Sequence, residues 1–345
     1  MNPSDISRAA DVLRRVVRRT PLEPSARLSA EVGVPVLLKR EDLQVCRSYK
    51  VRGAYHLISS LSTEERRCGV VCASAGNHGQ GVAYSCSQLG IPGRVYLPAT
   101  TPSQKRGRIA ALGGDFVTPA VAGRSFDDAD LAARRDSMRT GAVLVHPFDD
   151  DRTVAGQGTV AVEITEQCRE RIGTVIVPVG GGGLIAGMLL WLKHRLPDVH
   201  VVGAEPAGAA SMRAALSAGG PVSLTHLDPF VDGAAVARVG RIGYEVVRDL
   251  VDELVLVPEG AVCVEMVDLY QTEGIIAEPA GALACAAARM PLRHKPKGTV
   301  VCVLSGGNND IFRYSDVLAR ARQHAALRST QRRGRRVSSR KRVNR

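Results

Sequence analysis

Short apolar, β-rich runs alternate with helical patterns along most of the chain, and this alternation constrains the fold more than any other feature. The helical segments include Gly79–Leu89, Gln104–Leu112 and Leu184–Leu196. Continuously apolar strands joined by helical crossovers are typical of parallel sheets covered on both faces. The strand-like runs are too many for one small sheet, so we expect an α/β protein with two open, mostly parallel sheets. These runs are Gly69–Ala73, Arg94–Leu97, Asp115–Thr118, Val143–His146, Thr174–Val179, His200–Ala204 and Thr299–Leu304.

We expect the two sheets to form two domains. The small α/β domain is placed at 47–150 and the large one at 151–312, with the N-terminal segment 1–46 packing on the large domain. Residues 313–345 form a basic tail. Its last part is an Arg/Ser run without apolar periodicity, so we expect the tail to be disordered.

The tail accounts for nearly all of the net charge of +12. From Arg313 onward, twelve Lys/Arg stand against Asp316 alone, a net of +11, which leaves the first 312 residues near +1. No nucleic-acid-binding motif accompanies this charge, so we do not expect a nucleic-acid partner.

No apolar run reaches the roughly 18 residues of a membrane span, and no secretion signal opens the chain. The eight cysteines are scattered without a CxxC pair, which indicates reduced thiols in a cytoplasmic protein and no zinc site.

Lys50 is the first candidate for chemistry. It follows the charged corner 39–42 and falls at the start of a new element. The positive end of a helix dipole, together with any burial, favours the neutral amine that a Schiff-base lysine needs. On its own, a solvated surface lysine is the more common interpretation.

A run of four glycines joins a predicted strand to a predicted helix. Gly180, Gly181, Gly182 and Gly183 lie between Thr174–Val179 and the helix that opens at Leu184. Backbone N–H groups and the helix dipole converge there, which favours a phosphate ligand. A tight crossover explains one or two glycines but not four. Gly181-x-Gly183-x-x-Ala186, followed by Glu205 at the end of the next strand, also fits a relaxed dinucleotide fingerprint, so NAD binding is an equal alternative from this window.

Two further small-residue turns end strands. The first contains Ser74, Ala75, Gly76, Asn77 and His78, whose backbone N–H groups suit a carboxylate. Asn77 can hydrogen-bond a ring oxygen or can be an ordinary turn residue, and we favour a capping or core role for His78. The second turn begins at Ser305, which can also be a simple helix cap. Together with Lys50, three such turns predict a ligand crevice between the sheets.

Taken together, these stretches resemble the fold-type-II pyridoxal-phosphate enzymes (tryptophan synthase β-like), and specifically the biosynthetic threonine dehydratases, also called threonine ammonia-lyases. The resemblance runs from about Thr20 to Arg313. No single motif is specific, but the set is. It comprises Lys39–Gln44, Arg47–Ala54, Ala73–His78, Gly156–Thr159, Val179–Leu184, Glu205–Ala209, Val231–Ala235, Glu273–Ala282 and Ser305–Asp310.

The resemblance implies a role for each site residue. Lys50 would attach covalently to pyridoxal 5'-phosphate, and Gly180 to Gly183 with Leu184 would hold its phosphate. Asn77 would meet the ring hydroxyl and Ser305 the pyridine nitrogen. The backbone of Ser74 to His78 would take the substrate carboxylate. Glu278 either shapes the substrate end of the site or is a buried helix-capping acid, with equal weight.

The implied reaction is the deamination of L-threonine to 2-oxobutanoate and ammonia, the first step of isoleucine biosynthesis, in a cytoplasmic homodimer or homotetramer. L-Serine is expected as a slower substrate, and serine dehydratase or serine racemase is the alternative. Racemases of this family carry a second serine where this chain has Ala75, so we expect negligible racemisation. Ser211 stands where their divalent-metal site has an aspartate, so no metal is assigned.

The family's usual C-terminal ACT-like domain, which binds isoleucine or valine, is not expected here. Such a module needs about 70 or more residues to bury a core, and 33 follow Phe312. We therefore expect no feedback by isoleucine. For the Arg-rich end we favour an inert remnant over weak polyanion binding.

Overall fold

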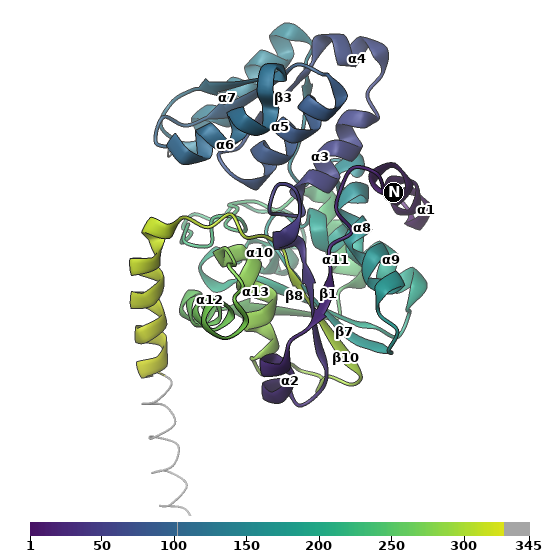
Figure 1. The fold of residues 1–345 in the computed structure, drawn as a ribbon, viewed down its shortest axis with the longest axis vertical. Helices are drawn as coiled ribbons and strands as arrows, with labels where there is room; N and C mark the ends of the chain where they lie inside the picture. Colours follow the sequence, from purple (N-terminus) through teal and green to yellow (C-terminus); the bar gives the residue numbers. More distant parts are fainter. Residues whose placement is uncertain (102, 328–345) are drawn as a thin grey trace, which may run out of the picture.

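A computed structural model describes residues 1–101 and 103–327. Two sheets divide the molecule into an upper and a lower part in Figure 1. Among the described helices, none has the length and apolar character needed to cross a membrane.

The larger sheet has six strands in the order β1-β2-β10-β7-β8-β9. All neighbours run parallel except β1, which pairs antiparallel with β2 at the edge. The strands are β1 (Leu22–Pro24), β2 (Val36–Arg40), β7 (Ile172–Pro178), β8 (His200–Pro206), β9 (Glu253–Val257) and β10 (Thr299–Leu304).

The smaller sheet is parallel throughout, in the order β5-β4-β3-β6. Pro119 lies in β5, which is an edge strand, where a missing N–H donor is tolerated. Its strands are β3 (Val70–Ala73), β4 (Gly93–Leu97), β5 (Val117–Val121) and β6 (Val143–Leu144).

Helices cover both sheets (Figure 1). Those of the upper part are α3 (Lys50–Ser59), α4 (Thr63–Cys68), α5 (Asn77–Leu89), α6 (Ser103–Gly113) and α7 (Phe126–Thr140). Those of the lower part are α1 (Pro3–Leu13), α2 (Ala26–Val32), α8 (Asp151–Gln167), α9 (Gly183–Arg195), α10 (Ser211–Ala218), α11 (Arg241–Leu250), α12 (Glu259–Glu273) and α13 (Pro279–Ala288).

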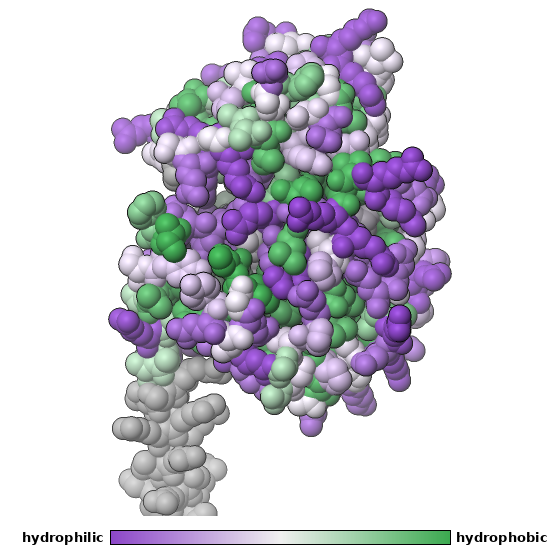
Figure 2. Space-filling view, viewed as in Figure 1, coloured by the Kyte–Doolittle hydropathy of each residue, from purple (hydrophilic) through white to green (hydrophobic). Residues whose placement is uncertain are grey.

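The larger sheet separates two apolar cores. Val175 and Val177 of β7 pack with α8, α9 and α11, whereas Ile176 packs with α12 and α13 on the other face. Successive strand residues point to opposite faces, so an uninterrupted apolar run serves both cores at once. The smaller sheet has its own core around Val70, Cys72 and Val95. Figure 2 shows hydrophilic side chains along the indentation between the two parts.

The predicted α/β class and the mostly parallel sheets are confirmed. Every predicted strand overlaps a strand of the structure, although β5 begins two residues later than its predicted run. The residues at which the domain boundaries fall stay a prediction.

One expectation about the tail is wrong. Residues 314–327 are helical rather than disordered. Val317 is fully buried in the core beneath α12 and α13, and Arg320 pairs with Asp228 (2.9 Å) while lying 4.3 Å from the centre of the Phe230 ring. These contacts come from residues distant in sequence, so the local composition does not reveal them. The Arg/Ser run from 328 on lies outside the described residues.

Candidate active site

The predicted site segments lie where strands end. Ser74 follows β3, Gly180 follows β7 shortly after Pro178, and Ser305 follows β10. Lys50 begins α3, as predicted. The segment just before it is tied to the Ser305 turn, because Tyr49 N–H donates to the Ser305 carbonyl (3.2 Å) and Ser48 forms a bridge with Gly306. The lysine and the last turn are therefore neighbours in space.

The Lys50 side chain is partly buried. Its Nζ donates to the carbonyl of Pro147 at 3.0 Å and lies 5.2 Å from the centre of the Tyr49 ring. Burial lowers the pKa of Lys50 from 10.5 to about 8, and the nearby charge of Glu278 opposes that shift only in part. A substantial fraction of the amine is therefore neutral near physiological pH, and the neutral form is the nucleophile.

The glycine loop opens α9 with free donors. In the described part of the chain, no acceptor is found for the N–H groups of 180–184. Gly182 has φ 94° and is the N-cap residue of α9. A Cβ on Gly181 would lie 2.3 Å from the Phe148 ring, and one on Gly180 would lie 2.9 Å from Ala234. The loop is thus a cradle of unpaired N–H groups at a helix N-terminus, the arrangement that binds phosphate.

Packing also explains the glycines in a way that the sequence did not suggest. A Cβ on Gly182 would lie 2.9 Å from Gly243, and one on Gly183 would lie 2.8 Å from the Phe148 carbonyl oxygen. Each of the four glycines therefore has a steric reason. Of the four, only Gly182 has a positive φ, so the expectation that a crossover conformation explains one or two of the glycines but not four agrees with the structure.

Sequence reasoning missed the loop after β6. The Pro147 carbonyl accepts from Lys50 Nζ and also from Gln157 Nε2, each at 3.0 Å, and the Phe148 ring packs against Gly181. Two residues thus join the lysine to the glycine loop. Neither Pro147 nor Phe148 has a side chain that could act as a catalyst or ligand. The only sequence signal near them was the short apolar strand that precedes them.

A chain of hydrogen bonds links two of the turns. Asn77 Nδ2 donates to Glu278 Oε1 (2.6 Å), and Asn308 Nδ2 donates to Asn77 Oδ1 (2.7 Å). Burial raises the pKa of Glu278 to about 7, and the charge of Asp232 adds to the effect. Glu278 is the N-cap residue of α13 but makes no side-chain capping bond. Its carboxyl is bonded to the Asn77 amide instead.

The turn after β3 offers backbone donors. Ser74 N–H donates to Tyr96 O, and Gly76 N–H donates to the Ser74 hydroxyl (3.2 Å). Among the hydrogen bonds of the described residues, none uses the N–H of Ala75, Asn77 or His78. Three donors therefore remain for an anionic ligand.

The His78 side chain has a different place. It is buried, and its Nε2 is 2.7 Å from the Val145 carbonyl. Burial lowers the pKa of His78 to about 3, so the ring is neutral at physiological pH. This matches the favoured core role of the side chain, while its backbone stays in the turn.

Ser305 directly follows β10 and is the third predicted contact for the ring. It is 3% exposed, and its hydroxyl donates to the Ala280 carbonyl at a long 3.2 Å. A hydroxyl in a weak bond can turn to a ring nitrogen without leaving a strong partner.

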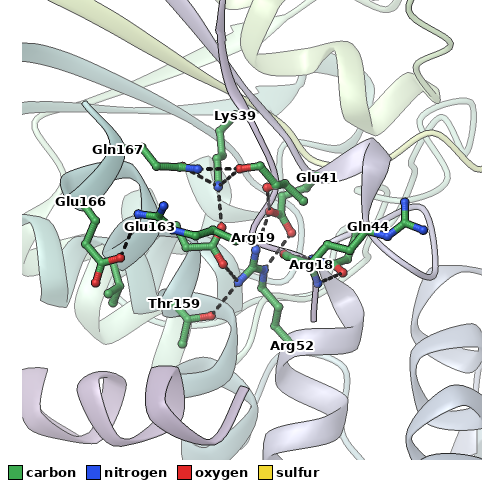
Figure 3. A network of polar contacts seen from close by, with 12 residues as sticks. Arg18, Arg19, Lys39, Glu41, Gln44, Arg52, Thr159, Glu163, Glu166 and Gln167 are labelled. Carbon is green, nitrogen blue, oxygen red and sulfur yellow. Dashed lines mark hydrogen bonds and ion pairs between the residues drawn. The ribbon is translucent and has the colours of Figure 1, made fainter. Parts of the chain in front are cut away.

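A buried charge network holds the helix that carries Lys50 (Figure 3). Arg52, two residues further along α3, donates to both carboxylate oxygens of Glu41 (2.8 and 2.7 Å) and to Glu163 (2.7 Å) on α8. Lys39 of β2 donates to Glu163 from the other side. Burial alone would raise the pKa of Glu41, but Arg52 outweighs it and holds that pKa below its usual range. The network joins α3 to the larger sheet and to α8.

The alternative interpretation as a dinucleotide site fails at Glu205. Its carboxylate is fully buried and accepts the backbone N–H groups of Met212 and Arg213 (3.0 Å for the latter) at the start of α10. An acid that caps a helix in the interior cannot bind a ribose hydroxyl.

Pyridoxal phosphate fits the residues that the fold gathers. The cradle of free N–H groups suits the phosphate, the partly neutral Lys50 amine suits an aldehyde, and Asn77 and Ser305 supply polar groups for a ring.

Comparison with known proteins gives the same chemistry. A family model described as "Pyridoxal-phosphate dependent enzyme" matches residues 13–306. The chain is 56% identical over 329 residues to the biosynthetic L-threonine dehydratase of Mycobacterium tuberculosis, covering 95% of this chain and 76% of that protein.

Two solved structures have a similar fold. One is the processed form of threonine deaminase isoform 2 from Solanum lycopersicum, with a TM-score of 0.86, 38% identity and 92% coverage of both chains. The other is maize serine racemase, with a TM-score of 0.85, 32% identity and coverage of 94% of this chain and 99% of that one.

Proposed function

The chain belongs to the family of pyridoxal-phosphate dependent enzymes, and we propose that it is a threonine dehydratase that converts L-threonine to 2-oxobutanoate and ammonia. The reaction loses water from Cα and Cβ, and water is regained when the nitrogen leaves as ammonia. The observation that carries the proposal is the partly buried Lys50 amine, with a pKa of about 8, which Pro147 and Phe148 link to a loop of free N–H groups suited to a phosphate. The relatives that are named threonine dehydratases at 44–56% identity support the substrate.

The cofactor, when bound, supplies an electron sink for the bonds at the substrate Cα. The backbone N–H groups of 180–184 would hold its phosphate. The amide of Asn77 and the hydroxyl of Ser305 would fix the ring at its two polar positions. Because Ser305 is neutral, it can donate to an unprotonated ring nitrogen, which favours prompt loss of the β-hydroxyl over transamination.

The substrate end of the crevice would orient threonine. The free N–H groups of Ala75, Asn77 and His78 would bind its carboxylate. Lys50 Nζ would then take the Cα proton as the general base, since its pKa of about 8 suits proton transfer near neutral pH.

We infer a dehydratase rather than a racemase because of Ala75. Racemisation needs a second proton donor on the opposite face of the substrate, where similar racemases carry a serine. A methyl group cannot donate. Serine dehydration stays open, because one methyl group is worth only about 1–3 kcal/mol of discrimination. The homodimer or homotetramer and the cytoplasmic location stay predictions.

Turnover of threonine by the loaded enzyme tests the proposal. Lys50→Ala should abolish 2-oxobutanoate formation, whereas Lys297→Ala, an exposed lysine at the far end of the larger sheet, should leave it unchanged. Chiral chromatography of a serine reaction should find no D-serine from wild type. Normal turnover by Lys50→Ala, or D-serine formed as fast as the keto acid, would refute the assignment.

A further inference from the structure

Two histidines and a glutamate converge at the amino-terminal edge of the larger sheet, at the opposite ends of the strands from the crevice. His200 begins β8, Glu253 begins β9, and His294 lies in the loop between α13 and β10. One ligand atom from each residue lies within 4.8 Å of the other two. The two imidazole rings are 5.0 Å apart, centre to centre.

The strand register brings His200 and Glu253 together. β8 and β9 pair in parallel with Val202 opposite Glu253. Alternate residues of a strand point to the same face, so His200 shares a face with Val202 and therefore with Glu253. Asp252 fixes the strand ends, because its carboxylate accepts from Val201 N–H (2.7 Å) and from Lys193 Nζ (2.6 Å).

Glu253 also positions the loop that carries His294. The backbone N–H of Arg293 donates to both oxygens of the Glu253 carboxylate, at 3.0 and 3.1 Å. This clamp acts on the residue next to His294. Glu253 is 6% exposed, whereas His294 is exposed, so one ligand is rigid and another can adjust.

A buried nitrogen in this cluster lacks a partner. Within the described residues, His200 Nε2 is shielded from water and makes no hydrogen bond. Its nearest carboxylate oxygen, on Glu253, is 3.5 Å away. An unpaired buried polar atom costs free energy, and a metal ion between the two groups would remove that cost.

We propose that His200, Glu253 and His294 bind a divalent transition-metal ion of the zinc class. Two imidazoles and a carboxylate are a donor set that zinc accepts, with a water as fourth ligand. Bonds of about 2.0–2.1 Å place tetrahedral ligand atoms about 3.3 Å apart. The cluster must therefore close by about 1.5 Å at most, which rotation of the exposed His294 side chain can supply.

A cavity of about 680 Å³, which both histidines line, gives an ion access to the site. Four cations, Arg171, Arg195, Lys295 and Lys297, line the same cavity with Glu170 and Asp198. Their positive charge opposes any cation in the cavity, so the carboxylate of Glu253 and the two imidazoles must outweigh it for the ion to bind. The site lies away from Lys50 and does not depend on the proposed function.

Zinc binding by the cofactor-loaded full chain tests the proposal. Wild type and each variant are dialysed against buffered Zn²⁺, and bound metal is measured by elemental analysis. His200→Gln and His294→Gln should each lose about one equivalent that wild type retains, with affinity at least tenfold lower. His226→Gln, an exposed histidine in a distant loop, should bind like wild type.

All variants keep the same cysteines, so any zinc bound by cysteines is equal in all of them. A difference in bound zinc between wild type and a histidine variant therefore reports on this site alone. His294 is exposed, so its variant should keep the wild-type circular dichroism spectrum even if His200→Gln does not fold. Zinc should raise the melting temperature of wild type and of His226→Gln only. An equal number of zinc ions in wild type and in His294→Gln, or none in wild type, would overturn the proposal.

Discussion

At the scale of single residues, Glu278 had two equally weighted roles from its sequence position, a helix-capping acid or a group at the substrate end of the site. The stretch before Pro279 was compatible with a capping acid, and Glu278 is the N-cap residue, yet its carboxyl accepts the Asn77 amide (2.6 Å) instead. Burial raises its pKa to about 7. In the unfolded chain the pKa returns to about 4.5. Such a group favours the folded state below pH 4.5, and this contribution is lost as the pH rises through 7.

Glu278→Gln should therefore stabilise the cofactor-free protein more at pH 8 than at pH 5. The amide keeps an acceptor for Asn77 and removes the titration. Relative to wild type, the free energy of unfolding in urea should rise by about 2–3 kcal/mol between the two pH values. Glu64→Gln, at a side chain 79% exposed, is the control and should show no such change. An equal difference at both pH values would contradict the buried, protonated carboxyl.

At the scale of elements, the glycine loop and helix α3 carry the site. Gly181→Ala would place a Cβ 2.3 Å from the Phe148 ring, so the loop must shift at a cost of about 1–3 kcal/mol. The N–H groups would then no longer converge. We expect at least tenfold weaker binding of pyridoxal phosphate, followed by absorbance as the cofactor-free protein is reconstituted. Gly220→Ala, where a Cβ meets nothing within 4 Å, should bind normally. Unchanged affinity in Gly181→Ala would show that the phosphate binds elsewhere.

Helix α3 depends on the Arg52 network of Figure 3. Arg52→Met would leave the carboxylate of Glu41 buried without its partner, at a cost of about 3–5 kcal/mol in the free energy of unfolding. Arg67→Met, on α4 with a side chain 76% exposed, removes a surface pair worth about 0–1 kcal/mol. Urea unfolding of both variants measures the contrast. Similar values for the two would mean that the network does not anchor α3.

At the scale of the whole molecule, the sequence predicted what local pattern controls. Apolar runs located the strands of both sheets except β1, β2 and β9, and small-residue turns located three of the segments that meet near Lys50. The rest depends on contacts between distant segments. The Pro147 carbonyl accepts a hydrogen bond from the Lys50 amine, although the two residues are 97 positions apart. The helix at 314–327 is held through contacts of Arg320 with Phe230 and Asp228. Neither contact can be predicted from the local amino-acid composition. The roles of the site residues stay predictions.

The central claim is that Lys50, among all the lysines, carries the cofactor. Borohydride reduction of the loaded protein fixes pyridoxal phosphate to whichever amine holds it, and peptide mass spectrometry locates that amine. The account predicts one modification per chain, on the peptide that contains Lys50. A modification on another lysine, or none on a protein that turns over threonine, would contradict it.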